Sequence, residues 1–163
     1  MMTARIHEPH ERSGSPGQGV QPLSFIGAYQ ASRMERVVVI REGLPALALV
    51  ETGRAMGISN EKLYSILHLP RATATRKIST RSLLSPEASE RVLGLYKLIG
   101  QVQVMVQESG NPEGFNAAEW LAKWLDEPSP ALGGQKPGDL LDTSEGQEIV
   151  SGVLSQMQSG AYA

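Results

Sequence analysis

Cationic side chains are concentrated between residues 70 and 81, and they are the best candidates for a chemical role in this sequence. Four Arg and Lys residues alternate there with threonines and small residues, and no acid interrupts them. A helix that reads the major groove of DNA needs long cationic groups for phosphates and guanine edges, and short side chains that allow close approach. The segment therefore predicts DNA contacts from Arg71, Thr73, Thr75, Arg76, Lys77 and Arg81. A solvated basic helix without a ligand is the alternative.

Acidic residues near the C-terminus are the other candidates for chemistry. Asp139, Asp142 and Glu145 follow a double glycine and could form a carboxylate pair for acid–base work. Each also lies close to the start of a helix, where a carboxylate satisfies free backbone amides. The double glycine lacks the Lys-Ser/Thr ending of a phosphate-binding loop, the chain has no cysteine, and its three histidines include no pair with metal-ligand spacing. We therefore expect no catalysis, no metal and no cofactor.

The net charge of −2 over 163 residues conceals two halves of opposite sign. Residues 1–107 carry 13 Lys and Arg against 8 acids, a net +5, whereas residues 108–163 carry two lysines against nine acids, a net −7. Such an asymmetry suggests an anionic partner for the first half and a different partner for the second, although two solvated faces would look the same. No apolar stretch is long enough for a signal peptide or a membrane span, so we expect a cytoplasmic protein with no membrane partner.

Helix signals begin at about residue 23. Residues 1–22 are rich in Gly, Ser and Pro and predict a disordered arm. One helix is expected over residues 23–42, with a stop at Gly43, although its β-branched centre could also form a short strand. Pro45 suits the first turn of a second helix, which ends at Gly57.

Two short helices joined by a tight turn follow. Ser59 is a good N-cap for the first of them, which must end near His68 because Pro70 disfavours helical geometry in the residue before it. Pro70 is well placed to open the second helix, which runs to about Ile78 and contains the cationic residues. This arrangement is a helix-turn-helix.

The rest of the chain also predicts helices. A long helix capped by Ser85 extends to Glu108, and its apolar seam packs internally or helps to form a dimer. Asn116 begins the next helix, and the last helix runs from near Thr143 to Gly160. The last helix is expected to bury Ile149, Val150, Val153, Leu154 and Met157. No convincing strand remains, so the predicted fold class is an all-α helical bundle.

The order of these features resembles that of the Xre/MbcA/ParS antitoxins. In the first half, the resemblance rests on Gly43-Leu44-Pro45, on Met56-Gly57-Ile58-Ser59, and on Leu69-Pro70 followed by Thr73, Arg76 and Lys77. In the second half, it rests on Trp120-Leu121, Trp124-Leu125, the stretch from Leu132 to Pro137, the stretch from Leu140 to Thr143, and Glu145-Gly146. The chain departs from the pattern at Gly138-Asp139, where family members often carry bulkier residues.

The resemblance implies an antitoxin of a type II toxin–antitoxin system whose RES-domain toxin depletes the cell of NAD. The expected parts are the arm at 1–22, a helix-turn-helix DNA-binding domain at 23–84 and a C-terminal toxin-binding domain at 85–163. The antitoxin would itself be no enzyme; it would block the toxin's active site and, with the toxin, repress its own operon at an operator. We also expect a homodimer, because one helix-turn-helix seldom binds DNA tightly enough alone.

The acidic half now has a hypothetical partner. A cleft that binds nucleotide phosphates is normally lined with Arg or Lys, and an acidic segment is complementary to such a cleft. We expect the last helix and the chain end to enter it, with the terminal carboxylate in a phosphate site. The predicted toxin-binding residues are Glu148, Gln156, Ser159, Gly160, Ala161, Tyr162 and Ala163. The alternative is a stand-alone helix-turn-helix transcriptional regulator whose C-terminal domain only dimerises.

Overall fold

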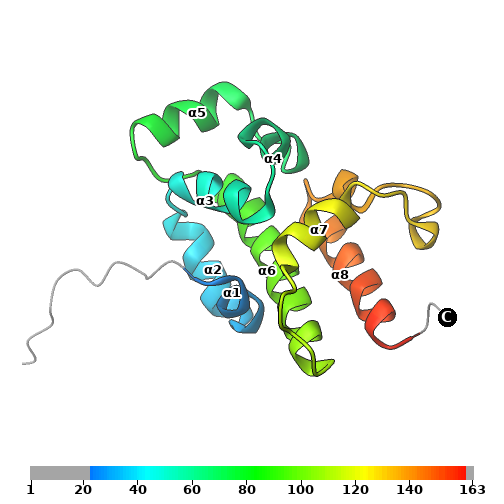
Figure 1. Cartoon of the computed structure of the whole chain (residues 1–163). Coiled ribbons are helices and arrows are strands. Elements are labelled where there is room, and N and C mark those ends of the chain that lie inside the picture. Colours follow the sequence, from blue (N-terminus) through cyan, green and yellow to red (C-terminus); the bar gives the residue numbers. More distant parts are fainter. Residues whose placement is uncertain (1–22, 161–163) are drawn as a thin grey trace, which may run out of the picture.

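The computed structural model describes residues 23–160, and within that range it contains helices and no strand (Figure 1). The α-helices are α1 (Phe25–Gln30), α2 (Arg33–Glu42), α3 (Leu47–Met56), α4 (Asn60–Ile66), α5 (Arg71–Ser79), α6 (Pro86–Glu108), α7 (Ala117–Leu125) and α8 (Ser144–Gln158). Two 3-10 turns, η1 (Pro130–Leu132) and η2 (Pro137–Leu140), connect α7 to α8. The all-α prediction is confirmed. The predicted arm lies outside the described residues, as do residues 161–163.

Helix α6 is the centre of the molecule. The Ser85 hydroxyl accepts a hydrogen bond from the Ala88 amide at 3.2 Å and caps the helix, as predicted, and Pro86 occupies its first turn. Helices α1 and α2 pack on one side of α6, and α7 and α8 pack on the other (Figure 1). The apolar seam of α6 is buried within the chain at Val92, Leu95, Ile99 and Val102. The centre of the seam therefore packs internally, whereas its ends at Ala88 and Val106 are half-buried.

The helix predicted over residues 23–42 is in fact two helices. Ser32 has extended backbone and starts α2, because its side chain accepts from the Glu35 amide while the Glu35 carboxylate accepts from the Ser32 amide at 2.7 Å. These hydrogen bonds lower the pKa of Glu35. Arg36 then bonds the end of α1, donating to the carbonyls of Ala28 at 2.9 Å and Tyr29 at 2.7 Å. The β-branched centre of α2 is helical, and Gly43 ends the helix with φ of +86°, as predicted.

The link between α2 and α3 differs slightly from the prediction. Pro45 lies before α3 rather than in its first turn, because it forms an isolated β-bridge with Leu83. The Leu84 amide donates to the Leu44 carbonyl at 2.7 Å, which ties this link to the segment that follows α5. At the other end, α3 stops as predicted at Gly57, which is left-handed with φ of +67°.

Buried glutamines join α6 to α8. The Gln147 amide nitrogen donates to the Leu141 carbonyl at 3.0 Å and to the Arg91 carbonyl at 3.4 Å. On α6, the Gln101 side chain donates to the Ser151 carbonyl at 3.0 Å and accepts from the Ser151 hydroxyl at 2.8 Å. Gly94 makes room for the Gln147 side chain, because a Cβ at residue 94 would overlap it. Buried polar groups that are fully bonded fix α8 in one position on α6.

The buried face of α8 was predicted correctly except at one residue. Val150, Val153 and Leu154 are buried, and Met157 is half-buried. Ile149, however, is 51% exposed. It lies about 100° round the helix from Val150, at the border of the face that packs on α6.

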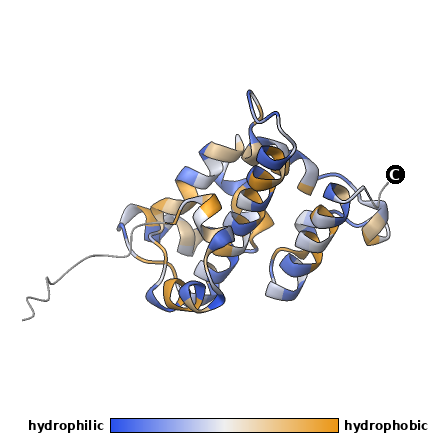
Figure 2. Ribbon diagram, turned by 90° about the horizontal axis from the view of Figure 1, so that it is seen from below, coloured by the Kyte–Doolittle hydropathy of each residue, from blue (hydrophilic) through white to orange (hydrophobic). Residues whose placement is uncertain are grey.

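The helices alternate hydrophobic and hydrophilic residues along their length (Figure 2), as expected for helices that each bury one face. Among residues 23–160, no helix is both long enough and apolar enough to cross a membrane.

Candidate functional site

Helix α5 lies at the periphery of the molecule and packs mainly on α4 (Figure 1). Ala74 is its one buried residue, and Ile78 is partly buried against the core. The structure brings the six predicted DNA-binding residues together on and just after this helix. Arg71, Thr73, Thr75, Arg76 and Arg81 are exposed, and Lys77 is half-buried.

The turn before α5 has an unusual residue in the left-handed region. His68 has φ of +50°, and the next amide, that of Leu69, donates to the Tyr64 carbonyl at 2.9 Å, the hydrogen bond that closes a Schellman motif. Glycine normally occupies this position because it has no Cβ. Arg91 of α6 holds the turn by donating from Nη1 to the His68 carbonyl at 2.9 Å. The turn is therefore fixed from the centre of the molecule.

The turn after α5 repeats this arrangement. Arg81 has φ of +52°, and the Ser82 amide donates to the Lys77 carbonyl at 2.9 Å. His68 and Arg81 are the two non-glycine residues with positive φ between residues 23 and 160, and they flank α5. Such conformations cost roughly 1 kcal/mol or more each. The orientation of α5 thus depends on two strained turns.

The charges of α5 are largely free. Arg71 Nη2 lies 3.4 Å from Glu61 Oε1, but both side chains are mostly exposed, and such a pair holds Arg71 only weakly. Over the described part of the chain, Arg76, Lys77 and Arg81 form no ion pair. A helix with unpaired cations on an exposed surface is suited to a polyanion.

Thr75 lies next to α4. Burial raises the pKa of the Tyr64 phenol, and the neighbouring Thr75 side chain partly opposes that shift. The Thr75 side chain is nevertheless exposed.

Helix α8 presents the second predicted surface. The Thr143 hydroxyl caps it by accepting from the Gly146 amide at 3.0 Å. Glu148, Gln156, Ser159 and Gly160 are all exposed on its outer side or at its end. The other predicted toxin-binding residues, Ala161, Tyr162 and Ala163, lie outside the described residues.

Three aromatic rings form a cluster on α7 and just before it. The Trp120 and Trp124 rings stack with centroids 5.9 Å apart and planes 10° apart, and Phe115 lies 6.2 Å from Trp120. The predicted cap is present, since the Asn116 side chain accepts from the Glu119 amide at 3.1 Å. Both tryptophans are half-buried and pack against the core.

A polar junction joins α4 to the loop after α7. Asp126 accepts from Lys136 Nζ at 2.9 Å and from Lys62 Nζ at 3.3 Å. These bonds lower the pKa of Asp126, and the same contact raises the pKa of Lys136. In the loop, Gly138 packs so close to the Leu125 carbonyl that a Cβ would lie 2.9 Å from it. The glycine that departs from the family pattern is therefore required by this loop.

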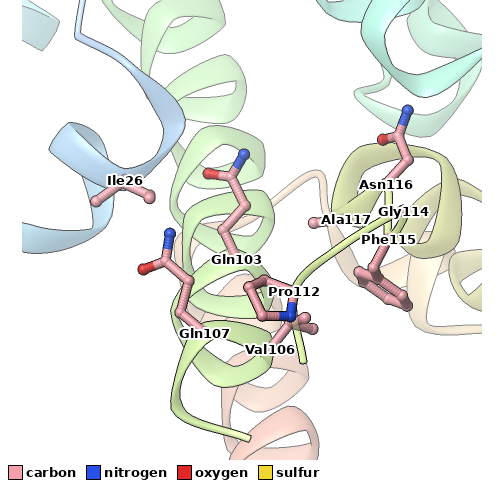
Figure 3. Close-up of a pocket in the computed structure, with 9 residues that line it drawn as sticks. All are labelled: Ile26, Gln103, Val106, Gln107, Pro112, Gly114, Phe115, Asn116 and Ala117. Atoms are coloured by element: carbon pink, nitrogen blue, oxygen red, sulfur yellow. The ribbon is translucent and has the colours of Figure 1, made fainter. Parts of the chain in front are cut away.

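An open pocket of about 430 Å³ lies between the end of α6, α1 and the loop before α7 (Figure 3). Three amide side chains, those of Gln103, Gln107 and Asn116, line it together with apolar groups such as Ile26, and none of its lining residues is ionisable. Within residues 23–160 no group of three or more His, Asp or Glu is placed to hold a metal ion. The pocket offers no acid–base chemistry.

Comparison with known proteins matches two parts of the chain to antitoxin domains. Residues 35–96 match the antitoxin Xre-like helix-turn-helix domain, and residues 113–160 match the antitoxin Xre/MbcA/ParS C-terminal toxin-binding domain. A relative from Sphingobium sp. (strain YBL2), described as a Prs ADP-ribosylating antitoxin, is 47% identical over 147 residues, which cover 90% of this chain and 92% of the relative. The chain belongs to the Xre/MbcA/ParS antitoxins.

The two surfaces of the antitoxin fall in different matched domains. Helix α5 lies in the helix-turn-helix domain, and α7 and α8 lie in the toxin-binding domain. The first match extends into α6, which packs against elements of both halves. The domain boundary that we predicted between residues 84 and 85 stays a prediction.

Three residues that position the antitoxin's α5 were not predicted from the sequence. Arg91 contributes through a hydrogen bond to a backbone carbonyl 23 residues away, and a contact with backbone leaves no pattern in the side-chain sequence. His68 and Arg81 take the left-handed turn positions that glycine usually occupies, so the usual signal for such turns is absent.

Proposed function

We propose that this antitoxin neutralises a cognate RES-domain toxin that consumes NAD, by covering the toxin's active site. The observation that carries the proposal is the match of residues 113–160 to the toxin-binding domain, in the half of the chain whose net charge is −7. The description of the Sphingobium relative names ADP-ribosylation, a reaction whose donor is NAD. A cleft that binds the pyrophosphate of NAD needs cationic side chains, and an acidic domain is complementary to it.

The proposed contacts lie on α8 and at the chain end. Glu148 carries the negative charge, Gln156 and Ser159 supply hydrogen-bonding groups, and the segment from Gly160 to Ala163 enters the cleft. In this proposal the antitoxin has no catalytic activity and no cofactor of its own, and it acts in the cytoplasm alongside its toxin.

The second part of the proposed function belongs to the helix-turn-helix half. Together with the toxin, this half represses the antitoxin's own operon. The exposed cations of α5 support this part, with Arg71, Arg76 and Arg81 directed to phosphates and guanine edges. Thr73 lies on the exposed side, where a short side chain allows close approach. Lys77 and Thr75 complete the set at the border with α4.

We infer that two copies of the antitoxin bind the operator, because paired helices on a two-fold site give the affinity that one lacks. The centre of the α6 seam is covered within the chain, so we place the second copy on another surface. Among residues 23–84 the large exposed apolar side chains are Met34, Val38, Leu47 and Leu83, of which Met34 is 70% exposed. Sedimentation equilibrium should give a dimer for the intact antitoxin and a monomer for Met34→Glu/Val38→Glu.

Growth rescue tests the proposed function. Expression of the cognate toxin, sought as a RES-domain protein encoded by a gene next to that of the antitoxin, should arrest growth, and co-expression of the intact antitoxin should restore it. Restored growth must coincide with a complex of the two proteins that survives size-exclusion chromatography. If the antitoxin binds operator DNA but neither rescues growth nor forms the complex, it is a stand-alone helix-turn-helix regulator.

A further inference from the structure

Gly152 lies in the middle of α8, where no contact among the described residues requires a glycine. Each of the other glycines on α6 and α8 makes room for a neighbour: a Cβ would overlap Gln147 at Gly94, the Phe25 carbonyl at Gly100 and the Leu140 carbonyl at Gly146. A Cβ on Gly152, in contrast, would meet no atom within 4 Å, and its φ lies outside the left-handed region. Among the described helical glycines it is alone in this respect.

An unexplained glycine weakens the helix. Glycine in a helix interior reduces the folding equilibrium constant about fivefold relative to alanine. The residue is exposed, so no internal packing offsets this loss. No contact among residues 23–160 accounts for the missing side chain.

The surroundings of Gly152 indicate a contact surface. At 100° per residue, Gly152 is at the centre of the outer face of α8, directly opposite the side that packs on α6. Ile149 precedes it by one turn and is 51% exposed, and Gln156 follows it by one turn and is also exposed. Glu145 and Glu148 lie about 20° and 40° from Gly152 round the helix, closer to the centre of this face than Ile149 at about 60°, and both carry negative charge. The face thus has a shallow notch at Gly152 beside acidic and polar side chains, with Ile149 at its border.

We propose that this notch is the point at which the toxin's backbone approaches α8 most closely, with an apolar toxin side chain against Ile149 and toxin cations beside Glu145 and Glu148. The inference rests on the proposed function. The toxin is the occupant because α8 lies within residues 113–160, the toxin-binding domain, and because acidic side chains beside the notch are complementary to a cationic surface. The opposite face of α8 packs on α6.

The variants Gly152→Ala and Gly152→Gln test the notch. Both residues favour helix more than glycine does, so the melting temperature of the free antitoxin should rise by about 2–4 °C. Affinity for the neighbouring-gene RES-domain protein, measured by isothermal titration calorimetry on the full chain, should fall several-fold for Gly152→Ala and at least 50-fold for Gly152→Gln. Ser65→Gln, an equivalent change on the exposed side of α4, should leave the affinity unchanged.

The outcomes separate this inference from the proposed function. If the intact antitoxin binds the toxin and Gly152→Gln binds it equally well, the notch is no contact and the proposed function stands. If Gly152→Gln lowers the melting temperature, the glycine has an internal role and the inference is overturned. If the intact antitoxin does not bind the toxin at all, both fail together.

Discussion

The two functional helices of this antitoxin are attached to the molecule in opposite ways. Helix α8 is fixed along its length, by buried apolar residues and by the bonded side chains of Gln101 and Gln147. Helix α5 has one buried residue, Ala74, and is positioned at its ends by the turns at His68 and Arg81. A rigid scaffold suits a surface that must match a folded protein, whereas a helix anchored at its ends can adjust to DNA.

The exposed side chains of α5 and α8 also differ in their chemistry. On α5, Arg71 and Arg76 are exposed and Lys77 is half-buried, and the charges are mostly unpaired, so the proposed attraction to DNA phosphates should depend on salt. On α8 the outer face combines Ile149 with polar and acidic residues, a composition that depends on shape as well as charge. We therefore expect changes in one region to leave the other function intact.

The largest expected effect is the loss of neutralisation on deletion of residues 158–163. The deletion removes the proposed cleft-entering segment but leaves the buried face of α8, which ends at Leu154, in place. Growth rescue in the presence of the toxin should be abolished. Operator binding by the truncated antitoxin, measured by fluorescence anisotropy, should stay within twofold of the intact chain; full rescue by the truncated antitoxin would refute the role of the chain end.

The triple variant Arg71→Ala/Arg76→Ala/Lys77→Ala tests the other region. Operator affinity should fall by about 100-fold or more at physiological salt, and the slope of log K against log salt should decrease by roughly 2–3 units, since each lost phosphate contact contributes about 0.9. Toxin neutralisation should be unchanged. Arg54→Ala, on the exposed side of α3, is the matched control; an equal loss for this control would show that only net charge matters.

Gln147→Ala should be the variant that most destabilises the α8 attachment. It removes two hydrogen bonds to buried carbonyls and leaves a cavity beside Gly94, with an expected loss of about 2–3 kcal/mol in the free energy of unfolding. Urea denaturation measures the loss. Gln156→Ala, on the exposed face of the same helix, should change the unfolding free energy by no more than about 0.5 kcal/mol. Equal effects of the two variants would mean that the buried amide does not fix α8.

The smallest effect is expected at the turn before α5. His68→Gly relieves a left-handed conformation and should stabilise the antitoxin by about 0.5–1 kcal/mol, seen as a melting temperature higher by about 2–4 °C. His68→Ala keeps the Cβ in the same conformation and should leave the melting temperature unchanged. A decrease for His68→Gly would contradict the view that the turn is strained.

Much of this architecture could be predicted from local signals. Ser59, Ser85 and Asn116 cap the helices that they were expected to cap, because side-chain capping depends only on residues three positions apart. The break at Ser32 was missed although the Ser-x-x-Glu pattern was present, because apolar residues continue on both sides of it.

What could not be predicted depends on contacts distant in sequence. The exposure of Ile149 follows from where α6 lies against α8, and periodicity alone does not show which of two adjacent apolar residues faces it. The burial of Gln101 and Gln147 depends on carbonyls supplied by other segments. The basic helix itself was located correctly, because four cations without an acid form a purely local pattern.

The central claim is that the acidic half of the antitoxin covers the toxin's active site while the basic half is free to bind DNA. The most direct test is NAD consumption by the purified toxin, titrated with the antitoxin in the presence and absence of excess operator DNA. We predict that NAD consumption falls to background at a stoichiometric ratio and that the DNA does not restore it. A toxin that keeps consuming NAD while stably bound to the antitoxin would contradict the claim.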